Sequence, residues 1–126
     1  MTHALTIYLA YGAALFSLAL GVLGLIAPSR ALTLIGLQLV PGLAHSISET
    51  RATYGGVFIG ASLVPIMTGE PYAFLTLAGC WLAAGIARSL SVVIDNAATQ
   101  FNFVSIAVEL GVSMLLAVPY LGAVAL

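Results

Sequence analysis

Residues 5–27, LTIYLAYGAALFSLALGVLGLIA, form a long stretch without a formal charge, and Pro28 follows it directly. The hydrocarbon core of a membrane is about 30 Å thick, and a helix needs roughly 20 apolar residues to cross it. The stretch meets this length, so we predict that it forms a membrane-spanning helix. The residues before it include no Lys or Arg, and we therefore expect the helix to be retained rather than removed as a signal peptide.

Three further stretches have a similar character, at residues 49–68, 72–94 and 101–122. Arg88 interrupts the second of these and Glu109 interrupts the third. Backbone N–H and C=O groups in lipid must be satisfied within the chain, so each stretch is expected to be helical. The sequence therefore predicts an all-α fold: one transmembrane domain, residues 1–126, built as an antiparallel bundle of four helices.

The segment after the first predicted helix is harder to place. Residues 31–44 are apolar but too short to span a membrane, and Gln38 and Pro41-Gly42 interrupt them. We predict a short helix at the membrane surface, or a re-entrant stretch, with residues 28–48 outside the regular spans. A longer, kinked start to the second helix is the alternative.

The composition excludes a soluble domain. Hydrophobic residues make up 62% of the chain and charged residues only 6%, with a mean hydropathy of +1.18, whereas soluble domains carry about a quarter charged residues. The net charge of -1 provides no basic surface, so nucleic acid is not expected as a partner. Cys80 is the single cysteine, which rules out an intrachain disulfide, and we expect it to be a small buried apolar residue.

The few arginines suggest an orientation. Arg30, Arg51 and, less directly, Arg88 lie on or near the first and third connections between predicted spans, whereas the second connection carries Glu70 and no cation. Because excess Lys and Arg favour the cytoplasmic side, the first and third connections are expected inside and both termini outside.

Small residues recur at helical spacing in two places. Gly56 and Gly60 form a GxxxG pair preceded by Gly55, and the first span contains Ala13, Ser17, Gly21 and Gly24. Small residues allow helix backbones to approach closely in lipid. We predict that Gly55, Gly56 and Gly60 serve helix packing, either within the chain or against a second copy or another membrane protein.

Polar side chains within the spans are the main candidates for a site, because a charge at membrane depth is costly and usually finds a partner. At 1.5 Å per residue, Arg88 lies about 10 Å inward from Asp95, and Glu109 lies about 12 Å inward from Phe101. If these spans are antiparallel, the two charges reach similar depth on the same side, and we predict an ion pair. We expect one polar cluster there, which either locks the helices together or binds a proton, ion, lipid headgroup or polar ligand: Glu49, Arg51, Tyr54, Arg88, Ser91, Asp95 and Glu109.

Three ordered motifs resemble a known family. Residues 49–56, ETRATYGG, followed by Gly60, are similar to its ExRAxYGG signature. Residues 85–91, GIARSLS, followed by Asp95, resemble its second motif, and Glu109 resembles the acidic residue of its last helix. The family is a small bacterial membrane family, the domain of unknown function numbered 4345. The resemblance implies a four-helix membrane fold and no established activity. Asn96 departs from the pattern, because a glycine is expected after the aspartate.

No nucleotide-binding, hydrolase or metalloprotease motif occurs, so an enzyme is not expected, nor is a cofactor or a metal site. We expect an accessory or interaction subunit, or an assembly partner, of a larger membrane complex. The alternative is a binder or transporter of a small lipophilic or ionic species that uses the polar cluster. The expected partners are the lipid bilayer and another membrane protein or a second copy of the chain. The expected location is the bacterial inner (cytoplasmic) membrane, crossed several times.

Overall fold

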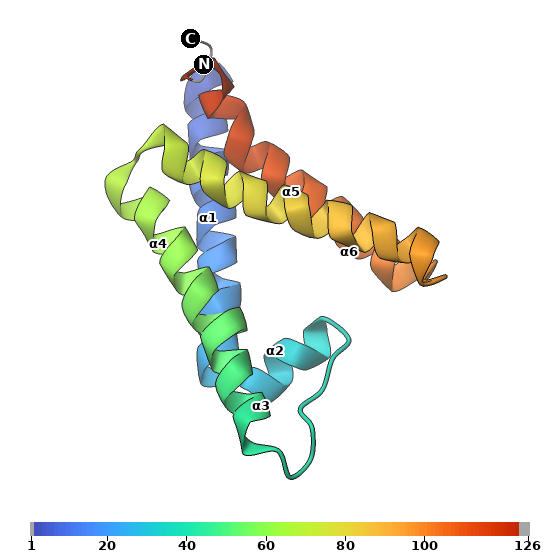
Figure 1. The fold of residues 1–126 in the computed structure, drawn as a ribbon. Coiled ribbons are helices and arrows are strands. Elements are labelled where there is room, and N and C mark those ends of the chain that lie inside the picture. The colour runs from blue at the N-terminus through green and yellow to red at the C-terminus, as the bar shows by residue number, and fades with distance from the viewer. Residues whose placement is uncertain (1, 124–126) are drawn as a thin grey trace. The chain divides into compact units, whose positions relative to one another are not determined.

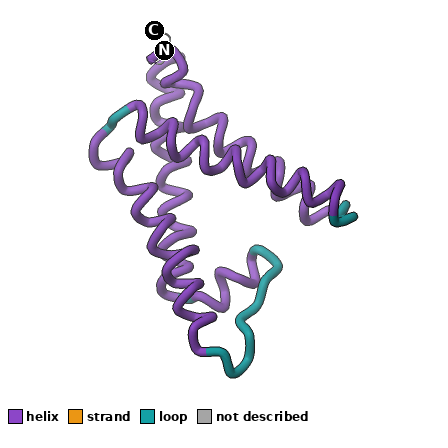
Figure 2. Tube along the Cα trace, viewed as in Figure 1, coloured by secondary structure: helices purple, strands orange, loops and turns teal. Residues whose placement is uncertain are grey.

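The computed structural model describes residues 2–123, and every regular element within them is helical (Figures 1 and 2). The α-helices are α1 (Thr2–Ile26), α2 (Pro28–Leu34), α3 (Ala44–Glu49), α4 (Phe58–Thr68), α5 (Pro71–Ile94) and α6 (Gln100–Ala117). A π-helix, η1 (Thr50–Val57), joins α3 to α4, and a 3-10 helix, η2 (Val118–Ala123), follows α6. The predicted all-α class is confirmed.

Three helices are long and apolar enough to cross a membrane: His3–Ile26, Pro71–Ile94 and Gln100–Gly122. They correspond to the predicted spans 5–27, 72–94 and 101–122. The predicted span 49–68 lies in a continuous helical run from α3 through η1 to α4, and this run is not among the three. Glu49, Arg51 and the adjacent glycines make it less apolar, and its crossing of the membrane stays a prediction.

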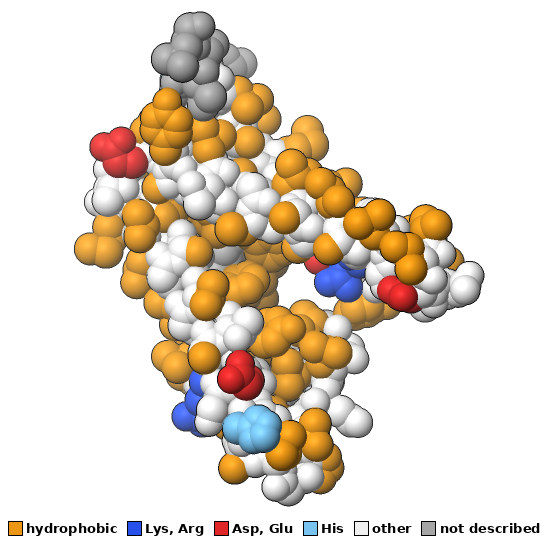
Figure 3. All heavy atoms as spheres, viewed as in Figure 1, with side chains coloured by type: hydrophobic (Ala, Val, Ile, Leu, Met, Phe, Trp, Pro, Cys, Tyr) orange, Lys and Arg blue, Asp and Glu red, His pale blue; other side chains and the backbone are white. Residues whose placement is uncertain are grey.

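The surface has the character expected of helices in lipid. Large apolar side chains such as Tyr8, Met67 and Val93 are each at least three-quarters exposed. In Figure 3, hydrophobic side chains spread over the visible surface of the helices, and charged side chains appear at only a few places. Water-soluble monomers rarely expose large contiguous apolar patches, so this surface fits a hydrocarbon environment.

The short segment after α1 is helical only in part. α2 begins at Pro28, whose fixed φ suits the first turn of a helix, and ends at Leu34. Residues 35–43 are non-helical, and Gly36 and Gly42 adopt positive φ there. The predicted short helix covers residues 28–34 rather than 31–44, and residues 44–48, which were expected outside the spans, form α3 at the start of the helical run to α4. The place of α2 at the membrane surface stays a prediction.

The chain forms two compact units. The first, called here the hairpin unit, combines the described residues up to Ala13 with those from Gly69 onward, and it contains α5, α6 and η2. The second, called here the π-helix unit, comprises Ala14–Thr68 and contains the rest of α1, α2, α3, η1 and α4.

In the hairpin unit, α5 and α6 lie side by side as an antiparallel pair (Figure 1). The fully buried Phe74 ring stacks on Tyr120 with centroids 4.7 Å apart and meets the edge of Tyr11 at 5.0 Å. Farther along, a Cβ placed on Gly85 would lie 3.2 Å from Leu110, so glycine allows the two helices to approach there. These contacts place the middle of α5 opposite the middle of α6.

A hydrogen bond also joins these two helices. The buried Ser113 hydroxyl of α6 donates to the carbonyl oxygen of Ala78 in α5 at 2.9 Å. Ser113→Ala is expected to lower the free energy of unfolding by about 1 kcal/mol, because interhelical hydrogen bonds in membranes contribute roughly that amount. Ser89→Ala is the matched control, since within residues 2–123 the Ser89 hydroxyl bonds only to the Gly85 carbonyl of its own helix. Equal unfolding free energies for both variants in detergent would contradict a contribution from the interhelical bond.

In the π-helix unit, glycines bring α1 directly against η1 and the start of α4. A Cβ on Gly24 would lie 2.6 Å from the carbonyl carbon of Tyr54, and one on Gly21 would lie 2.8 Å from the backbone nitrogen of Ile59. From the other side, a Cβ on Gly55 would lie 2.9 Å from the backbone nitrogen of Leu25. The helix backbones therefore touch here without intervening side chains, which is the close packing that small residues permit in membranes.

The close approach of the helix backbones does not involve Gly56 and Gly60, the GxxxG pair predicted for it from the sequence. A Cβ on Gly60 would meet nothing within 4 Å, and one on Gly56 would meet only the Arg51 carbonyl oxygen, at 3.8 Å. The physical reason is the rotation of this helical run about its axis: Gly56 and Gly60 are both exposed, whereas Gly55 and Ile59 are the residues that meet α1. Of the three predicted packing glycines, Gly55 makes the close contact, and a role for the other two against another protein stays a prediction.

Candidate functional site

The central feature of the hairpin unit is an ion pair between α5 and α6. Arg88 lies one turn after Gly85, on the side of α5 that faces α6. Its Nη2 lies 2.8 Å from Oε1 of Glu109, and its Nε lies 3.0 and 3.1 Å from the two carboxylate oxygens. The pair predicted from matched depth in two antiparallel spans is confirmed.

Asn102 is the third member of this group, and sequence reasoning missed it. The Nη1 of Arg88 donates to Oδ1 of Asn102 at 3.2 Å, and the Asn102 amide nitrogen donates to the Ala97 carbonyl at 2.8 Å. The turn before α6 positions it, because the Thr99 side chain caps the helix by accepting from the Asn102 backbone N–H. Asn102 lies seven residues, two helical turns, before Glu109, and this spacing in the sequence could have indicated that both face the same neighbour.

Glu109 is the most deeply buried member of this group. The Glu109 side chain is 8% exposed and that of Arg88 is 28% exposed. A buried carboxylate is tolerated when its charge is paired and its oxygens accept hydrogen bonds, and both conditions hold here. The geometry therefore suits a neutral, hydrogen-bonded lock between two membrane helices.

Arg88 still has unused hydrogen-bonding capacity. A guanidinium carries five N–H donors, and the bonds to Glu109 and Asn102 engage three of its N–H groups within the described residues. Two N–H groups remain on a side chain that is more than a quarter exposed. The lock can therefore accept one further hydrogen-bond acceptor without giving up the ion pair.

Ser91 and Asp95 form a separate contact at the end of α5. The Ser91 hydroxyl donates to Oδ2 of Asp95 at 2.6 Å, one turn further along the same helix. Asn96 follows with φ of +53°, in the left-handed region. Glycine and asparagine are the residues that most readily adopt this conformation, so Asn96 can serve this turn in place of the glycine expected from the sequence.

The other predicted members of the polar cluster lie in the π-helix unit. Glu49 ends α3, and Arg51 and Tyr54 lie in η1, with the two charged residues exposed and Tyr54 half-buried. Nothing within residues 2–123 forms a hydrogen bond or an ion pair with any of the three side chains. The gathering of all seven polar residues into a single cluster stays a prediction.

The π-helix itself coincides with the first sequence motif. It runs for eight residues, from Thr50 to Val57, and Gly55 and Gly56 lie within it. Such i→i+5 segments are rare and usually limited to one turn, and they often occur at functional sites. The buried Thr50 hydroxyl opens the segment by donating to the Ser46 carbonyl at 2.8 Å. The motif therefore encodes an unusual backbone as well as polar side chains.

Three apolar helices of spanning length, with an ion pair buried between two of them, define a helical membrane protein. The chain belongs to the family described as a domain of unknown function (DUF4345), which matches residues 4–120. Comparisons with curated proteins and with solved structures found no match.

Proposed function

We propose that the protein is a small accessory or interaction subunit that docks onto another membrane protein in a larger complex. The observation that carries the proposal is an exposed face of small residues on α5. Its members recur at three- and four-residue spacing along about three turns of helix: Thr76, Gly79, Cys80, Ala83 and Ala87. Sequence reasoning placed Cys80 in the interior, but it is exposed as part of this face.

The opposite face of α5 already has a partner. Phe74, Leu77, Ala78 and Gly85 are buried, and the contacts of Ala78 and Gly85 are with α6. A Cβ on Gly79, in contrast, would meet nothing within 4 Å. Because the hydrophobic effect does not drive helices together within lipid, helices in membranes pair through small residues that allow close approach. The exposed face has this composition, and the ion pair on the other side holds α5 in place.

The number of membrane crossings, the orientation and the cellular location are part of the same proposal. We propose four membrane crossings in one antiparallel bundle, with the run from α3 to α4 as the additional crossing. Both termini lie outside, because Arg30 and Arg51 favour an inner first connection. The setting is the inner membrane of a bacterium, and the role is one of assembly, with no enzymatic activity, no cofactor and no nucleic-acid partner.

Ala83→Leu tests the docking face directly. The variant inserts bulk at the centre of the face, and we expect at least a tenfold loss of a stoichiometric partner in detergent purification followed by mass spectrometry. Ala107→Leu is the matched control, because Ala107 is an exposed alanine on α6, outside the face. Both variants should melt at the temperature of the parent. A parent that purifies alone as a monomer, or a partner retained equally by Ala83→Leu, contradicts the proposal.

A second candidate function is favoured by the unused N–H groups of Arg88. They suit the carbonyl or other acceptor group of a small lipophilic or ionic species that reaches the ion pair through the membrane. Arg88→Lys keeps the charge and removes the planar arrangement of donors. A small molecule that co-purifies stoichiometrically with the parent, and is lost from Arg88→Lys, would favour binding or transport over assembly.

A further inference from the structure

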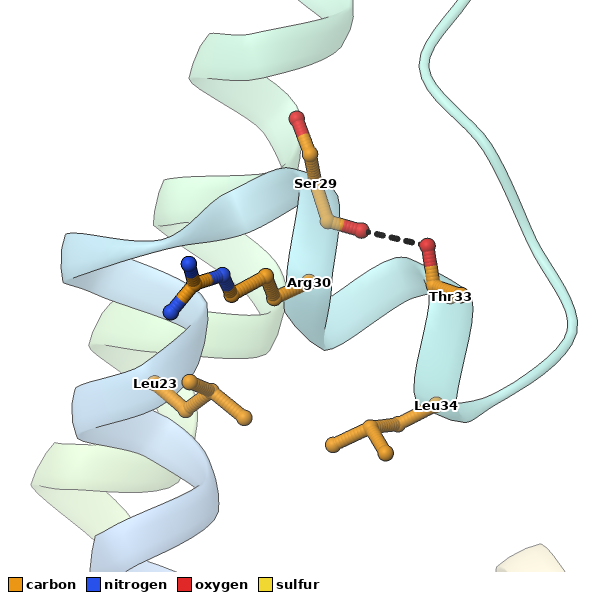
Figure 4. A pocket seen from close by; sticks show the side chains of 5 residues that line it. All are labelled: Leu23, Ser29, Arg30, Thr33 and Leu34. Atoms are coloured by element: carbon orange, nitrogen blue, oxygen red, sulfur yellow. Dashed lines mark hydrogen bonds between the residues drawn. The ribbon is translucent and has the colours of Figure 1, made fainter.

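A hollow of about 480 Å³ lies in the π-helix unit where α1 turns into α2 (Figure 4). Its lining consists of Leu23, Ser29, Arg30, Thr33 and Leu34. The hollow is shallow and open to its surroundings rather than enclosed. The hollow is separate from the Arg88–Glu109 pair, which belongs to the hairpin unit.

Arg30 is the charged group of this hollow. It is exposed, and it makes no ion pair or hydrogen bond within residues 2–123. It lies four residues beyond the end of the candidate span His3–Ile26, whereas Leu23 lies in the last turn of that span. The hollow therefore lies where the chain leaves an apolar helix of spanning length, next to a cation without a partner in the described residues.

The remaining lining residues divide by chemistry. Figure 4 shows the Leu23 and Leu34 side chains on either side of the hollow, with the Arg30 guanidinium beside Leu23. The Thr33 hydroxyl donates to the Ser29 carbonyl at 2.9 Å, and the Ser29 hydroxyl points away from the hollow. The walls of the hollow are almost wholly apolar, so Arg30 lines it mainly with the aliphatic part of its side chain, and the lining contains no carboxylate.

We propose that an anionic phospholipid binds here, with the start of an acyl chain in the apolar hollow and the headgroup phosphate at the Arg30 guanidinium. The guanidinium of Arg30 matches the phosphate oxygens with its planar arrangement of N–H donors. Leu23 and Leu34 contact the upper part of an acyl chain. A zwitterionic headgroup is disfavoured because its ammonium group would find no carboxylate among the lining residues. The site stands independently of the docking face on α5.

The test is native mass spectrometry of the full-length protein in detergent, titrated with phosphatidylglycerol or with phosphatidylcholine. We expect one phosphatidylglycerol to bind in preference to phosphatidylcholine. Arg30→Gln should weaken this binding by about fivefold, the effect of one arginine near an anionic membrane surface. Arg51→Gln is the matched control, because Arg51 is an exposed arginine of the same unit whose side chain makes no hydrogen bond or ion pair within residues 2–123 and does not line the hollow.

Three results would overturn the proposal. The first is unchanged binding to Arg30→Gln, and the second is an equal loss in Arg51→Gln, which would indicate general attraction of anionic lipid to any arginine. The third is displacement of the lipid by inorganic phosphate, which would assign the hollow to a free anion. Unchanged melting temperatures of both variants would show that the comparison concerns binding and not folding.

Discussion

Glu109→Ala is expected to lower the free energy of unfolding by about 3 kcal/mol, because removing one partner of a buried ion pair leaves an uncompensated charge. The charge left behind is that of Arg88, which loses both of the carboxylate oxygens that accept its Nε and Nη2 donors. Arg88→Ala is expected to act in the same direction. The measurement is unfolding in mixed detergent micelles, with yield from membranes as a second readout.

The double variant Arg88→Ala with Glu109→Ala separates a lock from a functional site. It should be more stable than Glu109→Ala alone, since it leaves no buried charge unpaired. Glu49→Ala is the control, because Glu49 is an exposed acid without a bond in the described residues, and its removal should change stability by less than about 0.5 kcal/mol. If both single variants are as stable as the parent, the ion pair is not structural, and a role in binding gains support.

Gly24→Ala is expected to destabilise the π-helix unit by about 3 kcal/mol, the upper part of the usual range for an overpacked core. The added Cβ would press against the Tyr54 carbonyl and would lie 2.9 Å from the Gly55 backbone nitrogen. Backbone atoms of η1 cannot rotate away as a flexible side chain can. Either α1 must therefore move or the π-helix must change its register.

Gly12→Ala is the matched control for this substitution. Gly12 lies in the same helix and is exposed, and a Cβ there would meet nothing within 4 Å. Alanine favours a helix over glycine by roughly 0.5–1 kcal/mol, so this control is expected to be neutral or slightly stabilising. Equal melting temperatures in detergent for Gly24→Ala and Gly12→Ala would show that α1 and η1 do not pack as closely as the structure indicates.

The location of the polar network shows how far reasoning from one sequence reaches. The pairing of Arg88 with Glu109 was predictable, because depth follows from residue count once two helices are antiparallel. The role of Asn102 was not predictable. Asp95 lies equally near the end of its helix and carries a charge, so the sequence alone made it an equally good partner for Arg88. Side-chain geometry decided between them: Asp95 bonds to Ser91 of its own helix, and Asn102 reaches Arg88.

Hydropathy and length are properties of the sequence alone, and they determined the helical class, three of the four predicted spans as helices long and apolar enough to cross a membrane, and the depth at which opposite charges meet. Only the tertiary structure decided which small residues bring helices together. That choice depends on how each helix is rotated about its axis, which spacing alone does not fix, because the adjacent residues Gly55 and Gly56 point to different sides of the helix. The contact therefore falls on Gly24 and Gly55 rather than on the GxxxG pair Gly56 and Gly60.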